Sequence, residues 1–111
     1  MSTTEQDISS LLQSLQKTLL QKPHISSVED INEGYCGMVA GNVYTKLGKP
    51  DEMKLCRAGE QSDFHYWIEY KGAFYDVERP EGVTNWQDLP FFQRHPEVSS
   101  FEYELWVKQG Y

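Results

Sequence analysis

The segment from residue 64 to residue 78 restricts the fold of this chain more than any other. Two runs rich in aromatic and β-branched residues flank the dipeptide Lys71-Gly72, which is a two-residue turn signal. This pattern predicts an antiparallel hairpin with strands at about 64–70 and 73–78. In such a hairpin Tyr70 pairs with Ala73. That pairing fixes the register, because a slip by one residue would turn every side chain to the other face of the sheet.

The predicted register brings an imidazole and a carboxylate together. His65, Trp67 and Asp76 share one face, and His65 and Asp76 are diagonal neighbours about 7–8 Å apart at the backbone, a gap that side chains can span. Glu78 lies opposite His65 in the same register, and Asp63 stands two residues before His65 in the sequence. The hairpin therefore predicts a histidine–carboxylate pair in which Asp76 is the first candidate and Glu78 and Asp63 are alternatives.

A cysteine stands where a loop is expected to become a helix. Cys36 follows Gly34 and Tyr35, and a helix is predicted over about 36–47 that ends at Gly48. A thiol in the first turn of a helix feels the helix dipole, which favours the thiolate by about 0.3–1 kcal/mol. A cysteine at a helix start, a histidine on a strand and a carboxylate on the next strand are the parts of a cysteine-nucleophile site.

Each of these three residues has a definite role in such a site. Cys36 is expected to be the nucleophile, His65 the general base and acid, and Asp76 the residue that orients the imidazole. The backbone N–H of Cys36 would supply half of an oxyanion hole, and Asn32 or a nearby backbone amide is the candidate for the other half. Two further residues beside these, Tyr35 and Trp67, are candidates for the walls of a substrate cleft. Cys56, on a predicted strand, is expected to be structural.

The rest of the chain predicts an α+β domain that spans residues 1–111, with helices packed on a small antiparallel sheet. An amphipathic leucine-rich helix is expected at about 5–21, capped by Thr3 or Thr4 and ended before Pro23. Residues 24–35 are expected to be a loop. The remaining expected segments are a short strand at 53–57, a long irregular excursion at 79–100 held by Trp86, Leu89, Phe91 and Phe92, and a closing strand at about 101–107.

Composition excludes several classes of function. The 111 residues carry 17 acidic and 10 basic side chains, a formal net charge of −7, which is unsuited to binding nucleic acid or an anionic membrane surface. No apolar run approaches the roughly 20 residues of a membrane span, and the polar N-terminus does not have the pattern of a secretory signal. A cytoplasmic location with reduced thiols is therefore expected.

Neither a metal nor another cofactor is expected from the sequence. No two of the cysteines and histidines have the spacing of zinc ligands, and two cysteines are too few for a disulfide framework. The expected partner is a protein or peptide substrate, and the oligomeric state is left open. A binding or inhibitory module without turnover, which would grip its partner through residues 79–100, is the alternative to an enzyme.

Three short motifs resemble the papain-like and transglutaminase-like superfamily of cysteine proteases and acyltransferases. They are Gly34-Tyr35-Cys36-Gly37 at the start of a helix, His65-x-Trp67 on a strand, and Tyr75-Asp76 at the end of the next strand. The resemblance covers about residues 30–80. It implies an α+β core with a nucleophile helix on an antiparallel sheet and a Cys36–His65–Asp76 triad. Such proteins form a thioester and pass the acyl group to water or an amine, in hydrolysis or transfer at amide, isopeptide or thioester bonds.

Overall fold

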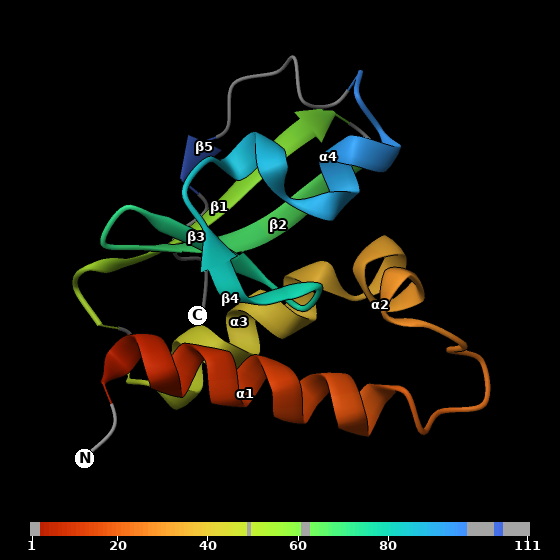
Figure 1. Cartoon of the computed structure of the whole chain (residues 1–111), viewed down its shortest axis with the longest axis horizontal. Helices are drawn as coiled ribbons and strands as arrows, with labels where there is room; N and C mark the ends of the chain where they lie inside the picture. The colour runs from red at the N-terminus through yellow and green to blue at the C-terminus, as the bar shows by residue number, and fades with distance from the viewer. Residues whose placement is uncertain (1–2, 49, 61–62, 98–103, 106–111) are drawn as a thin grey trace.

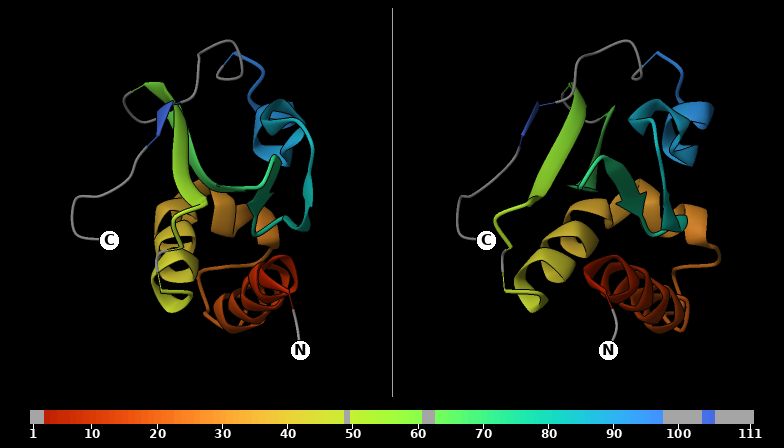
Figure 2. Two further views of the ribbon diagram at one scale, coloured as in Figure 1. Left: turned by 90° about the vertical axis from the view of Figure 1, so that its left-hand side faces the viewer. Right: turned by 60° about the vertical axis from the view of Figure 1, so that its left-hand side comes forward.

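An antiparallel sheet forms the centre of the molecule in the computed structural model, which describes residues 3–48, 50–60, 63–97 and 104–105 (Figure 1). Its strand order is β4-β3-β2-β1-β5. Helices α1 and α3 cover one face, and α4 with a short 3₁₀ helix covers the other (Figure 2). The described part of the chain is therefore α+β, as predicted. The strands are β1 (Met53–Glu60), β2 (Asp63–Tyr70), β3 (Ala73–Asp76), β4 (Arg79–Val83) and β5 (Glu104–Leu105).

The hairpin has the predicted register. Strands β2 and β3 pair antiparallel, with Tyr70 opposite Ala73 and Ile68 opposite Tyr75. Lys71 and Gly72 both have positive φ, as a two-residue turn requires. Strand β3 ends at Asp76, two residues before the predicted end, because the chain turns there into a strand that the sequence did not indicate.

That strand, β4 (Arg79–Val83), corrects the prediction that the irregular excursion begins at residue 79. It pairs with β3 at the edge of the sheet, where a proline such as Pro80 is tolerated. Gly82 has φ +86°, and a Cβ there would lie 2.7 Å from the Tyr75 ring. Glycine therefore satisfies both the backbone and the packing at this position.

Helix α1 (Thr4–Leu19) confirms the predicted N-terminal helix and its cap. The Thr3 side chain accepts a hydrogen bond from the Gln6 N–H while the Gln6 side chain accepts one from the Thr3 N–H, which forms a capping box. Ile8, Leu12 and Leu19 are buried against the sheet and α3. The leucine stripe is thus used for core packing.

The predicted loop at 24–35 contains a helix instead. Helix α2 (Val28–Gly34) begins at Ser27, whose side chain caps it by accepting from the Asp30 N–H. The serine and aspartate that suggested a turn are the cap and the acidic first turn of this helix, and Ile31 anchors it in the core. Helix α3 (Cys36–Lys46) follows almost at once and matches the predicted nucleophile helix.

Strand β1 is longer than the predicted strand at 53–57. Of the predicted closing strand at 101–107, Glu104–Leu105 forms β5 and pairs with Cys56 and Arg57 of β1. The other residues of that prediction lie outside the described part of the chain. No helix in the described ranges is long and apolar enough to cross a membrane.

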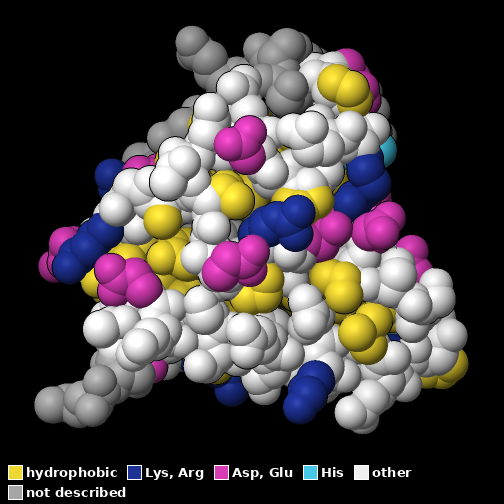
Figure 3. Space-filling view, viewed as in Figure 1, with side chains coloured by type: hydrophobic (Ala, Val, Ile, Leu, Met, Phe, Trp, Pro, Cys, Tyr) yellow, Lys and Arg dark blue, Asp and Glu magenta, His cyan; other side chains and the backbone are white. Residues whose placement is uncertain are grey.

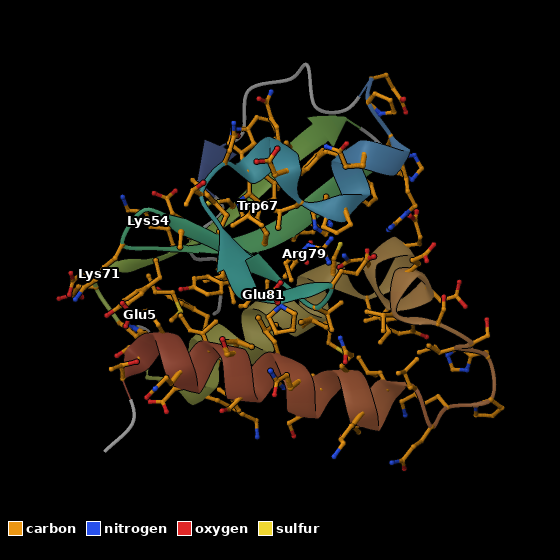
Figure 4. The ribbon with its side chains drawn as sticks, in the orientation of Figure 1. Glu5, Lys54, Trp67, Lys71, Arg79 and Glu81 are labelled. Carbon is orange, nitrogen blue, oxygen red and sulfur yellow. The ribbon has the colours of Figure 1, made fainter. Side chains whose placement is uncertain are left out.

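The excursion after β4 packs as predicted through its aromatic residues. It contains the 3₁₀ helix η1 (Trp86–Asp88) and helix α4 (Pro90–Arg94). Leu89, Phe91 and Phe92 are buried and form a second core cluster with Trp67 on the sheet. Figure 4 shows Trp67 between the sheet and this segment. This second layer encloses the face of the hairpin that carries His65.

Candidate active site

The hairpin joins the predicted imidazole and carboxylate directly. His65 Nε2 lies 2.8 Å from Asp76 Oδ2, and both side chains are almost fully buried. Their strands are paired in the register predicted from the turn at Lys71-Gly72, so this contact follows from local sequence. The ring is further fixed by Phe91 of α4, which stacks on it with centroids 4.6 Å apart and 9° between the planes.

The Asp76 carboxylate is held by donors on both oxygens. Oδ1 accepts the backbone N–H groups of Glu78 and Arg79 at 2.9 and 3.0 Å, which turns the chain from β3 into β4. Oδ2 accepts from His65 and from Asn32 Nδ2, the latter at 3.1 Å. Asp76 is therefore the carboxylate that bonds to the imidazole, and Glu78, the alternative from the sequence, makes other bonds.

Glu78 belongs to an ion pair that the sequence did not suggest. Arg94 of α4 donates from Nη1 and Nη2 to the two Glu78 oxygens at 3.0 and 2.8 Å, and from Nε to Glu33 at 3.1 Å. The pKa of Arg94 is raised, chiefly by its hydrogen bond to Glu78. On the side of α2 and α4 in Figure 3, basic and acidic side chains lie next to one another. Arg94 stood in a segment without a recognisable motif, so sequence reasoning had no signal for it.

Asn32 lies on the inner side of α2 and is 1% exposed. Its Nδ2 donates to Asp76 Oδ2 at 3.1 Å and to Glu78 Oε1 at 2.8 Å. An amide nitrogen has two hydrogens, so none is left for an oxyanion. This arrangement disagrees with the prediction that Asn32 completes an oxyanion hole, because two carboxylates take the hydrogens that the role needs.

Cys36 is the first residue of α3 and is half-buried. Its side chain acts on His65: burial alone lowers the pKa of that imidazole, but hydrogen bonding to Asp76 and to Cys36 and the charges of both raise it to about 9. His65 Nδ1 is buried and has no hydrogen-bond partner of ordinary geometry. Since Nε2 is bound to Asp76, Nδ1 is the nitrogen that remains for the thiol. Catalytic hydrogen bonds in free enzymes are often long or poorly aligned.

The two candidates for a substrate cleft differ in position. Trp67 is 0% exposed and stacks on Trp86 at 5.4 Å, so the prediction that it forms an open cleft wall is wrong: the excursion after β4 covers it. Tyr35, next to Cys36, is half-buried, and its hydroxyl lies 2.6 Å from His24 Nε2. A groove of about 690 Å³ runs along α3 and is lined by Gly37, Met38, Gly41, Asn42, Thr45, Lys46 and Tyr66, and Cys36 is not part of its lining.

Cys56 has the opposite environment from Cys36. It is fully buried in the second core cluster, and its Sγ donates to Glu69 Oε1 at 3.8 Å. Burial and the neighbouring Glu69 charge raise the pKa of this thiol strongly. Cys56 is thus an unreactive structural thiol. Both cysteines are free, and the described residues contain no cluster of His, Cys, Asp or Glu suited to a metal ion.

Comparison with known proteins gives no relative for this chain. No family model, no curated protein and no solved structure matches it. The function must therefore be argued from the geometry of the site.

Proposed function

We propose that this chain is a small cysteine-nucleophile hydrolase or acyltransferase with a papain-like or transglutaminase-like arrangement. The observation that supports it most is the hydrogen bond between His65 Nε2 and Asp76 Oδ2, which leaves Nδ1 as the nitrogen available to the half-buried Cys36 thiol. Three residues far apart in sequence interact in one place, with the nucleophile at the start of a helix. The substrate proposed is an amide, isopeptide or thioester of a protein or peptide.

The chemistry of each step follows from these positions. The thiolate of Cys36 attacks the acyl carbon, and a carbon–sulfur bond forms as the carbonyl electrons move to oxygen. The His65 imidazolium gives its Nδ1 proton to the leaving amine or thiol as the acyl bond breaks, which leaves a thioester on Cys36. Water or an amine then attacks the thioester, His65 takes up a proton, and the thiolate is released.

Charge stabilisation in this mechanism comes from the helix and from Asp76. The first N–H groups of a helix have no intrahelical acceptor, so the backbone N–H of Cys36 is suited to bind the oxyanion. The Asp76 side chain accepts the hydrogen bond of the imidazolium and stabilises it, as a triad carboxylate does. Two backbone N–H groups bond to its Oδ1, which leaves Oδ2 for His65.

The alternative is a binding module that keeps this fold without turnover, and one observation favours it. The narrow internal space bordered by Cys36, Asn32 and Asp76 is too small for a water molecule, and His65 is fully buried. A protein with this closed arrangement would offer its surface, rather than its thiol, to a partner.

Thiol reactivity separates the two proposals. At pH 7, iodoacetamide should alkylate Cys36 at least about 100-fold faster than Cys56, because His65 serves as the base for the first thiol while burial protects the second. The chromogenic acyl donor p-nitrophenyl acetate should then give a burst of one p-nitrophenolate per chain and leave one acetyl group on Cys36, detected by mass spectrometry.

The controls are variants of the same site. His65→Gln should abolish the burst while leaving the circular dichroism spectrum unchanged, and Cys36→Ala should give no acetylated protein. Slow alkylation of Cys36 at the rate of an ordinary exposed thiol, with no burst, would overturn the enzyme proposal and leave the binding module.

A further inference from the structure

We propose that Asn32 is a positioning residue of this site, which holds the Asp76 carboxylate against the His65 ring and is itself held by the Glu78–Arg94 pair. This inference rests on the proposed function, because it gives Asn32 a role in the same triad. Asn32 touches neither a reacting atom nor the thiol in this role. It acts through Asp76.

The orientation of the Asn32 amide is fixed by its partners. Nδ2 faces Asp76 Oδ2 and Glu78 Oε1, at 3.1 and 2.8 Å. Turning the amide over would place its oxygen against two carboxylates, where acceptors would face acceptors. Asn32 can therefore occupy this position in one orientation, with both hydrogens engaged.

Asp76 Oδ2 needs this second donor to keep its direction. Within the described part of the chain, His65 and Asn32 are the two side chains that bond to Oδ2. If Asn32 is removed, His65 alone of these two holds Oδ2, and the carboxylate can pivot about the bonds that Oδ1 keeps to the backbone N–H groups of Glu78 and Arg79. Catalytic groups lose much of their effect when they are displaced by about 1 Å.

Arg94 neutralises Glu78, the second carboxylate to which Asn32 donates. Its two-pronged contact with Glu78 offsets that negative charge, and its third bond reaches Glu33, which follows Asn32 on α2. Arg94 thus ties α4 to α2 and to the turn after β3. The line of contacts from Arg94 through Glu78 and Asn32 ends at Asp76, and the Glu78 side chain within it is only 11% exposed.

A double-mutant cycle between Asn32 and Asp76 tests the role. The rate constant for alkylation of Cys36 by iodoacetamide at pH 6.5 is measured in the wild type, Asn32→Ala, Asp76→Ala and the double variant. Asn32→Ala should slow alkylation about 10-fold and should cause no further loss in the Asp76→Ala background, since it acts through that carboxylate. Equal losses in both backgrounds, or none in either, would overturn the inference.

A second readout reports on the imidazole itself. The pKa of His65, followed by NMR, should fall in Asn32→Ala, because a displaced Asp76 bonds the ring less well. The ionisable groups that act on this ring are Asp76 and Cys36, and Glu78 is linked to Asp76 through the Asn32 amide. An unchanged His65 titration would contradict the proposal even if the alkylation rate changed.

A variant outside the core covers the case in which Asn32→Ala does not fold. Arg94→Gln frees Glu78 and should slow Cys36 alkylation about 2- to 5-fold through the same line of contacts. Lys71→Gln is the matched control: it removes the cation of an exposed pair with Glu52 at the tip of the hairpin and should leave the rate unchanged (Figure 4).

The two proposals fail in different ways. Slow alkylation of Cys36 in the wild type would overturn both the proposed function and this inference. Fast alkylation of Cys36 in the wild type, with the same rate in Asn32→Ala and in Arg94→Gln, would overturn only the positioning role of Asn32.

Discussion

Titration of His65 should make the folded chain less stable as the pH rises from 6 to 9. The pKa of this imidazole is about 9 in the folded chain against an ordinary value of 6.5. A raised pKa means that the folded state binds the proton more tightly than the unfolded state. The stabilisation is therefore complete below pH 6.5 and is lost as the pH rises through 9. A rise of the His65 pKa from 6.5 to about 9 corresponds to about 3 kcal/mol in the free energy of unfolding.

The variant Asp76→Asn isolates this contribution. It keeps the shape of the side chain but removes the charge and the acceptor that, with Cys36, raise the pKa of His65. In this variant burial is the main influence on the pKa of His65 and lowers it, so the free energy of unfolding should change much less between pH 6 and 9. Burial also raises the pKa values of Cys56 and Tyr75, but the stability that these two groups contribute is lost mainly above pH 9 and equally in both proteins.

Urea unfolding at half-unit steps of pH, followed by tryptophan fluorescence, measures the effect in both proteins. The midpoint for the wild type should fall steadily over this range at constant slope m. A wild-type curve that is flat from pH 6 to 9, or a curve for Asp76→Asn that falls as steeply, would refute the reasoning. The curve for Cys36→Ala should lie between those of the wild type and Asp76→Asn, because Cys36 raises the pKa of His65 less than Asp76 does.

Two further predictions concern the shell around the site. Gly82→Ala should destabilise the chain by about 2–4 kcal/mol in urea or thermal unfolding, because φ is +86° and the new Cβ would lie 2.7 Å from the Tyr75 ring. Gly48→Ala, at φ +80° in open space, is the control and should cost only about 1–2 kcal/mol. Equal costs for the two variants would contradict the packing argument. Phe91→Ala should lower the free energy of unfolding by about 3–5 kcal/mol and expose His65 to hydrogen exchange, because the buried Phe91 ring stacks on the imidazole. A decrease below about 1 kcal/mol would show that α4 does not cover the His65 ring.

Much of the scaffold of the site could be predicted because its signals are local. The turn at Lys71-Gly72 set the register of the hairpin, and that register placed His65 beside Asp76 before any contact was known. The leucine spacing of α1 and its cap at Thr3 are likewise properties of neighbouring residues. Strand alternation and helix capping need no knowledge of the rest of the fold.

The predictions for residues 24–35 and 79–83 were wrong because the residues there are compatible with more than one local structure. Ser27 and Asp30 favour a turn or a helix start equally, and burial of Ile31 decides for the helix. Pro80 and Gly82 argued against a strand, but an edge strand accepts both when its partner is β3. Local propensity could not choose between these outcomes.

The sequence by itself determined the N-terminal helix, the helix that begins at Cys36, the hairpin and the pairing of the imidazole with a carboxylate, because those depend on the spacing of nearby residues. Only the tertiary structure decided that Asp76 bonds to His65 while Glu78 pairs with Arg94, that Trp67 is covered, and that Asn32 bonds to carboxylates. Each of these choices depends on Arg94, Phe92 or another residue brought from far along the chain. A side chain's hydrogen-bond partners are fixed by burial and competition among all neighbours, and the packed fold alone supplies those neighbours.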